Sequence, residues 1–230
     1  MTLYITIEGP EATGKTTQAN LLLDNLRHDF PKTPVILTKE PGSSFDPACK
    51  SIRKIILEAD VSDKAALLLF LADRAQHIAK VIRPNLNNGN IVISDRSSLS
   101  TVVYHIAKLM VGTEENIPSD YFYEMLDFAQ ELQPDICFVA NADFDWAKSQ
   151  LVERGGLDRI EKFGDSFHRN VHALFANVRF DDSPKLHPLM EKIESMKCLP
   201  KRIVYLPKTN EQSIENISYQ ILDKVSEFLD

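Results

Sequence analysis

Several common features are scarce or missing in this sequence of 230 residues. No apolar run is long enough to cross a bilayer, and the opening MTLYITIEG leads directly into a strand pattern, without a secretory leader. The only cysteines are Cys49, Cys137 and Cys198, an odd number without metal-type spacing, as expected for reduced thiols in a cytoplasmic protein. The formal net charge of −7 excludes a general attraction to nucleic acid. These absences exclude membrane and nucleic-acid partners but allow a local basic site for a small phosphorylated ligand.

Strand patterns alternate with helix patterns along the whole chain. Short β-branched runs at 3–8, 35–38, 91–94, 136–140 and 202–207 predict strands. The intervening periodicity predicts helices at 16–27, 65–82, 98–110, 119–132, 145–154, 165–178 and 211–229, with Pro84 ending the second of them. This alternation favours an α/β domain whose parallel sheet is covered by helices on both faces. We expect one domain over residues 1–230, with a surface insertion at about 179–201, where prolines are frequent.

A phosphate-binding loop follows the first predicted strand. The stretch IEGPEATGKTT contains G-x-x-x-x-G-K-T between a strand and a helix, the context in which this motif holds the phosphates of a nucleotide. Backbone N–H groups and the helix N-terminus attract the phosphates, the lysine reaches the terminal ones, and the threonine hydroxyl binds Mg²⁺. A glycine-rich turn without a ligand is the alternative, and the complete motif argues against it. The predicted ATP-binding residues are Gly9, Pro10, Glu11, Ala12, Thr13, Gly14, Lys15, Thr16 and Thr17.

The class of phosphate-loop protein is narrowed by segments that are absent. No N-K-x-D segment is present to read guanine, no Leu-Ser-Gly-Gly segment indicates a transporter ATPase, and the chain is too short for most motor ATPases. A short chain with this loop near its N-terminus is typical of a nucleotide kinase. The acceptor is then the open question.

Four further stretches follow the predicted strands in order: KEPGSS, LLLFLADRAQH, DRSSLSTVVYH and RGGLDRIE. Asp95 can hold Mg²⁺ through water, and Arg96 offers a planar fork that suits a monophosphate. Each residue also has an ordinary reading, since Asp95 could cap a helix and Arg96 could form a surface ion pair. Phe70 and Arg74 share a helix face, although Phe70 and Tyr104 could equally be core residues.

Taken together with the loop, these stretches resemble the thymidylate kinase family over nearly the whole chain. The resemblance implies the P-loop nucleoside-monophosphate-kinase fold, a three-layer domain with a five-stranded parallel sheet. It implies ATP and dTMP as substrates, Mg²⁺ bound by Thr16 and Asp95, and a homodimer. Arg96 would hold the acceptor phosphate, Phe70 would stack on thymine, Arg74 would bond a base carbonyl, and Tyr104 would fill the space of a ribose 2′-hydroxyl. The implied acceptor-binding residues are Glu11, Lys39, Glu40, Pro41, Phe70, Arg74, Arg96, Ser100, Thr101, Tyr104 and His105.

A lid is expected at about residues 153–165. Gly155 and Gly156 can act as hinges, while Arg154 and Arg159 can bring positive charge to the transferred phosphoryl group. An ordinary solvated helix–loop–helix is the alternative. We predict Lys15, Arg96, Arg154 and Arg159 as the catalytic residues.

Glu11 puts a negative charge in a loop that binds anions. Its side chain could simply point to solvent, but the resemblance implies that it accepts a hydrogen bond from the 3′-hydroxyl of the acceptor. Some relatives follow this acid with an arginine, whereas this chain has Ala12. The catalytic arginine is therefore expected from the lid, as in the bacterial-like variant of the family.

The sequence departs from the family pattern at four positions. Lys39 replaces an arginine, Ser43 a glycine, His105 a glutamine that bonds the base, and Gln150 an arginine near the adenine. These changes affect base preference and donor affinity more than reaction class.

Two other functions fit the same residues. A deoxynucleoside kinase would need a general base for its hydroxyl acceptor, and Glu40 could serve. A regulatory module that binds nucleotide without turnover comes from another class.

Overall fold

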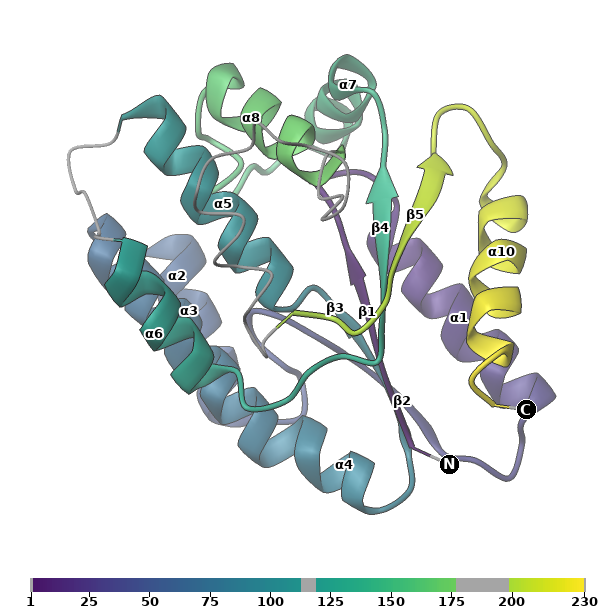
Figure 1. The fold of residues 1–230 in the computed structure, drawn as a ribbon. Coiled ribbons are helices and arrows are strands. Elements are labelled where there is room, and N and C mark those ends of the chain that lie inside the picture. The colour runs from purple at the N-terminus through teal and green to yellow at the C-terminus, as the bar shows by residue number, and fades with distance from the viewer. Residues whose placement is uncertain (1, 113–118, 177–198, 230) are drawn as a thin grey trace.

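The computed structural model describes residues 2–112, 119–176 and 199–229 (Figure 1). Its centre is a parallel sheet of five strands in the order β2-β3-β1-β4-β5. The strands are β1 Leu3–Glu8, β2 Val35–Lys39, β3 Ile91–Asp95, β4 Ile136–Asn141 and β5 Ile203–Lys208. The predicted α/β class and parallel sheet are thus confirmed.

Helices cover both faces of the sheet, which produces the three layers visible in Figure 1. On one face, odd-numbered apolar residues of β1 pack with α1 (Lys15–Asp29) and α10 (Ile214–Ser226). On the other face lie α3 (Asp63–His77), α5 (Ser98–Val111), α6 (Ser119–Ala129) and α8 (Asp165–Ala176). Because β1 is the middle strand and has helices on both sides, the loop that follows it rests on a rigid base.

Two local predictions differ from the structure. Helix α2 (Pro47–Glu58) was not predicted, although Asp46 caps it by accepting the N–H of Cys49 at 2.9 Å. The helix predicted to end before Pro84 continues as a π-helical turn, η1 (Ile78–Ile82), and then as α4 (Arg83–Asn87). Proline lacks an N–H group, and Pro84 is accommodated because it falls in the first turn of α4, after the widened turn.

The predicted insertion falls largely on residues 177–198, which lie outside the described residues. Helix α7 (Phe144–Arg154) precedes the predicted lid. Within the part of the chain that the structure describes, no helix is both long and apolar enough to cross a membrane.

Strand register sets where the site forms. Asp95 lies opposite Ile7 on one side and Lys39 on the other, so the carboxyl ends of β2, β3 and β1 meet at one edge of the sheet. Ligands of open parallel sheets bind at this edge.

Candidate active site

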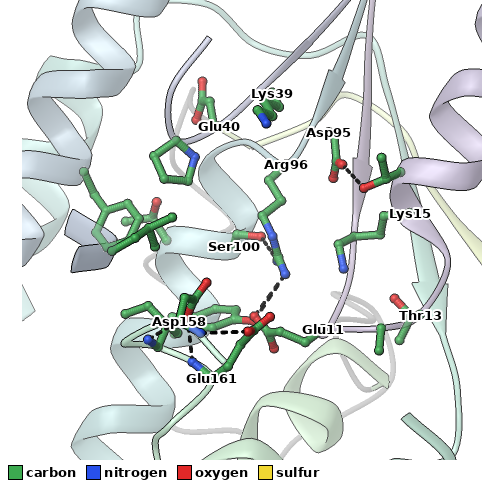
Figure 2. A pocket seen from close by; sticks show the side chains of 18 of the residues that line it. Glu11, Thr13, Lys15, Lys39, Glu40, Asp95, Arg96, Ser100, Asp158 and Glu161 are labelled. Atoms are coloured by element: carbon green, nitrogen blue, oxygen red, sulfur yellow. Dashed lines mark hydrogen bonds and ion pairs between the residues drawn. The ribbon is translucent and has the colours of Figure 1, made fainter. Parts of the chain in front are cut away.

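A cavity of about 930 Å³ opens at the carboxyl edge of the sheet, and Figure 2 shows side chains that line it. Its wall combines the phosphate-binding loop, the loop after β2, the inner faces of α3 and α5, and the segment predicted as a lid. Most predicted site residues meet here: Glu11, Ala12, Thr13, Gly14, Lys15, Thr16, Thr17, Lys39, Glu40, Pro41, Phe70, Arg74, Asp95, Arg96, Ser100, Thr101, Tyr104, His105 and Arg154. Gly9, Pro10 and Arg159 do not belong to the lining.

The phosphate-binding loop requires glycine at its first position. Gly9 has φ 140°, and a Cβ atom there would lie 2.2 Å from the carbonyl oxygen of Ala140 in β4. The loop is further fixed by Thr13, whose hydroxyl donates to the Pro10 carbonyl at 2.9 Å. Lys15 also donates to the Pro10 carbonyl, and its ammonium group is buried at the start of α1. Burial, together with the nearby Arg96, lowers the pKa of Lys15 to about 8.

Thr16 and Asp95 form a pair of oxygen ligands beside the loop. The Thr16 hydroxyl donates to Asp95 Oδ2 at 2.5 Å. Hard oxygen donors of this kind suit Mg²⁺, which usually keeps few protein ligands and takes the rest from phosphates and water. No cluster of three or more His, Cys, Asp or Glu side chains suited to a metal occurs among the described residues. The donor set therefore fits Mg²⁺ bound together with a nucleotide.

Arg96 is held over the cavity by an unusual backbone conformation. Its φ of 75° is in the left-handed region, which costs a non-glycine residue about 1–3 kcal/mol. The guanidinium donates from Nη1 to the carbonyl of Gly9 and to Ser100 Oγ, both at 2.8 Å. Such strain persists where the surrounding structure fixes it, and it is common at functional sites.

The negative charge of Glu11 is balanced by positive charges inside the site. Its Oε1 lies 3.1 Å from Arg96 Nη2 (Figure 2) and accepts a hydrogen bond from the Tyr104 hydroxyl. Burial opposes ionisation, but the charges of Arg96 and Lys15 outweigh it and hold the pKa of Glu11 below its ordinary value. The side chain does not point to solvent, and Arg96 and Lys15 supply the positive charge around it.

The end of the cavity next to the loop after β2 contains a buried ion pair. Arg74 donates to Glu40 Oε2 from Nε at 3.0 Å and from Nη2 at 2.7 Å, while His77 Nδ1 lies 3.0 Å from Oε1. Burial alone would raise the pKa of Glu40, yet Arg74 and His77 lower it to about 2. Both oxygens of Glu40 are thus engaged by cationic or polar partners.

The residues that are predicted to surround the thymine base lie at the same end of the cavity. Phe70 and Thr101 are only partly buried and border the cavity, so Phe70 is not a core residue. His105 stacks on Phe122 with ring centroids 3.9 Å apart. Burial and the neighbouring Lys108 lower the pKa of His105 to about 4, so its imidazole is neutral at pH 7. A neutral ring can offer one donor and one acceptor to a base.

The two predicted lid arginines lie in different surroundings. Arg154 borders the cavity and its Nη2 donates to Glu161 Oε2 at 2.6 Å. Arg159 instead donates to the Val61 carbonyl at 2.7 Å and lies 3.8 Å from Asp63. Only Arg154 is therefore placed to meet a ligand in this structure.

Two residues that contact the loop after β2 were not predicted. Arg53 of α2 lines the cavity and donates to the Pro41 carbonyl at 2.6 Å. Asp73 accepts the N–H of Gly42 at 3.0 Å. The Asp46–Pro47 start signal of α2 would have pointed to Arg53, because it predicts a helix directly behind the loop.

Comparisons with known proteins identify the family of the chain. The family model described as thymidylate kinase matches residues 7–197. A curated thymidylate kinase of Exiguobacterium sp. is 31% identical over 99% of this chain and 95% of its own length. Another from Pseudomonas fluorescens (strain SBW25) is 36% identical over 87% of this chain and 92% of its own length. The crystal structure of thymidylate kinase from Ehrlichia chaffeensis, 23% identical, matches 97% of this chain and 98% of its own with a TM-score of 0.65, which supports the fold. The chain belongs to the thymidylate kinase family.

Proposed function

We propose that the protein transfers the γ-phosphoryl group of ATP to dTMP and releases ADP and dTDP. The observation that carries this proposal is one cavity in which the phosphate-binding loop, Arg96 and Phe70 all take part. A donor triphosphate on the loop and an acceptor nucleotide against Phe70 would meet at Arg96. Family membership supports the same reaction.

Catalysis in this proposal rests on alignment and charge. The attacking atom is an oxygen of the acceptor phosphate, which is already an anion, so no strong base is required. Lys15 and Arg96 neutralise charge on the transferred group, and Arg154 adds a third cation from the lid. The catalytic role predicted for Arg159 is not supported by its position outside the cavity lining.

We assign Mg²⁺ to Thr16 and Asp95, together with phosphate oxygens of ATP. When bound, the ion would neutralise phosphate charge. The chain's own part is to present the Thr16 hydroxyl, in the first turn of α1, and the Asp95 carboxylate, at the end of β3, next to Lys15.

The acceptor site is assigned to the predicted residues around Phe70 and Arg74. Phe70 offers a partly exposed ring for stacking, and buried Arg74 has a guanidinium nitrogen, Nη1, that has no hydrogen-bond partner among the described residues. A base carbonyl would satisfy this nitrogen. His105, as a neutral imidazole, would take the place that glutamine has in many relatives.

A nucleoside kinase is disfavoured by the state of Glu40. Phosphorylation of a hydroxyl needs a general base with a pKa near the working pH. The pKa of Glu40 is about 2, and its oxygens are bonded to Arg74 and His77. A carboxylate in that state is a weak proton acceptor.

The test is ADP formation in a coupled assay with dTMP, dUMP or thymidine at equal concentration. We expect turnover with dTMP, none with thymidine, and none after Mg²⁺ is removed by a chelator. Lys15→Ala should lower kcat by about 10²-fold or more, whereas the exposed Lys32→Ala should not change it. Turnover of thymidine alone would identify a nucleoside kinase, and ATP binding without any turnover would identify a regulatory module.

We further propose a cytoplasmic homodimer. Helices α3 and α6 pack together and carry the exposed apolar side chains of Leu68, Tyr121 and Phe128. The buried free thiols of Cys49 and Cys137 fit a reducing compartment. Sedimentation velocity that gives twice the 26.1 kDa chain mass would support the dimer, and a monomer at micromolar concentration would contradict it.

A further inference from the structure

Glu8 is a fully buried carboxylate for which the proposed reaction has no use. It is the last residue of β1, is 0% exposed and does not line the cavity. Its oxygens face the turn between β3 and α5. Glu8 Oε1 accepts the N–H of Ser97 at 2.7 Å and that of Ser100 at 3.3 Å, and Oε2 accepts the Ser100 hydroxyl. A buried carboxylate with three donors from one turn fixes the position of that turn.

Ser100 joins Glu8 to Arg96. Because the Ser100 hydroxyl gives its hydrogen to Glu8, its oxygen lone pairs remain free to accept from Arg96 Nη1 at 2.8 Å. Figure 2 shows the Arg96 guanidinium between Ser100 and Glu11, inside the cavity. The three side chains form a directed chain of hydrogen bonds from a buried carboxylate to the guanidinium.

The same carboxylate supports the strained backbone of Arg96. The turn with φ 75° is held by the Arg96 N–H, which donates to Ile7 at 2.9 Å, and by the Ser94 hydroxyl, which donates to the Arg96 carbonyl at 2.8 Å. The next N–H along the chain, that of Ser97, is the one that Glu8 accepts. Glu8 therefore fixes both the backbone that aims Arg96 and the hydroxyl that orients its guanidinium.

We propose that Glu8 is a positioning residue for recognition of the acceptor phosphate and acts through Ser100 on Arg96. This proposal rests on the proposed function, because it takes Arg96 as the group that binds the phosphate of dTMP. Glu8 itself touches no ligand. A merely structural role, in which Glu8 only caps α5, predicts a general loss of stability without a preference for one substrate.

Glu8→Gln is the first variant, because it keeps the shape and removes the charge. One amide oxygen can still accept from Ser97, but the amide nitrogen must then donate to Ser100, which can no longer give its hydrogen to residue 8. We expect the KM for dTMP to rise about ten-fold, as for the weakening of one charge-assisted hydrogen bond, and the KM for ATP to change less than two-fold. Exposed Glu215→Gln is the matched control and should match the wild-type protein in both constants.

Thymidine is the probe that separates positioning from folding. It has the base and sugar of dTMP but no phosphate, so its affinity as a competitive inhibitor should be unchanged in Glu8→Gln. Ser100→Ala should also weaken the binding of dTMP. The double variant should bind dTMP no more weakly than the more affected single variant, because both changes break the same series of hydrogen bonds.

Wild-type turnover of dTMP in the same assay tests the proposed function separately. If the wild-type protein turns over dTMP and Glu8→Gln keeps its KM, Glu8 has no positioning role. Equal losses of affinity for thymidine and dTMP would likewise overturn the proposal in favour of a structural role. If Glu8→Gln does not fold, Glu8→Asp keeps the charge but shortens the reach, and the same selective loss for dTMP over thymidine decides the matter.

Discussion

Glu8 is the last residue of β1, and Glu40 directly follows β2 at the same edge of the sheet. Both are buried, but their pKa values shift in opposite directions. Burial raises the pKa of Glu8 to about 7, and its closest partners are neutral N–H and O–H donors of Ser97 and Ser100. The pKa of Glu40 falls to about 2 despite equal burial, because Arg74 and His77 contact its oxygens. The comparison shows that the partner, more than the depth of burial, decides the charge state of a carboxylate.

The two acids should affect stability at different pH. Glu40 has a lowered folded-state pKa, so its contribution is present above its unfolded value near 4.5 and is lost as the pH falls toward 2. Glu8 has a raised folded-state pKa, so its contribution is complete below 4.5 and is lost as the pH rises through 7.

The largest expected effect is that of Glu40→Gln. The change leaves the guanidinium of Arg74 buried without its counter-charge, which typically costs about 3–5 kcal/mol of unfolding free energy. Urea unfolding at pH 7 measures it, with Glu215→Gln as a control that should stay within about 0.5 kcal/mol of the wild-type protein. A loss below about 1 kcal/mol would mean that the ion pair of Glu40 is not what distinguishes it from Glu8.

The pH dependence of Glu8→Gln should be next in size. Between pH 4.5 and 8 the wild-type protein loses stability as Glu8 ionises, and glutamine cannot ionise. The difference in unfolding free energy between variant and wild type should therefore shift in favour of the variant by about 2–3 kcal/mol over this range. Parallel stability curves of the two proteins would show that Glu8 titrates at an ordinary pKa.

Glu11 provides a third buried acid, with Arg96 as its counter-charge. Glu11→Ala should raise the KM for dTMP or lower kcat, by about ten-fold for one lost hydrogen bond to the sugar, while ATP binding stays largely intact. The monophosphate of 3′-deoxythymidine sharpens the test, since it lacks the hydroxyl in question. The wild-type protein and Glu11→Ala should have the same KM and kcat for this analogue. An unchanged KM and kcat for dTMP in Glu11→Ala would show that Glu11 does not contact the acceptor.

The smallest effect concerns the network around Glu40. Ser43 is fully buried, and its hydroxyl lies 2.9 Å from Thr38 Oγ1, which lies 2.8 Å from His77 Nε2. Ser43→Ala should lower the unfolding free energy by about 1 kcal/mol, because it removes one buried hydrogen bond. Thermal unfolding measures this, and Ser51→Ala, on an exposed helix surface, is the control.

Local patterns in the sequence predicted the strands and the phosphate-binding loop after β1. Both follow from short-range rules, since a strand followed by G-x-x-x-x-G-K-T admits few structures. Asp95 and Arg96 line the cavity, and their roles there stay predictions. The opposite pKa shifts of Glu8 and Glu40 could not be predicted, because their partners are 89 and 34 positions away in the chain. Helix α2 was not predicted because it begins directly after a loop marked by Pro41 and Gly42, and Arg53, which lies on this helix, was therefore not predicted either.

The different surroundings of Arg154 and Arg159 have a consequence for how the cavity keeps its shape. Arg159 donates to the carbonyl of Val61, 98 positions earlier in the chain, and lies beside Asp63, which borders the cavity. This contact ties the segment after α7 to the connection between α2 and α3. A residue outside the cavity lining thus holds two distant parts of the cavity border together.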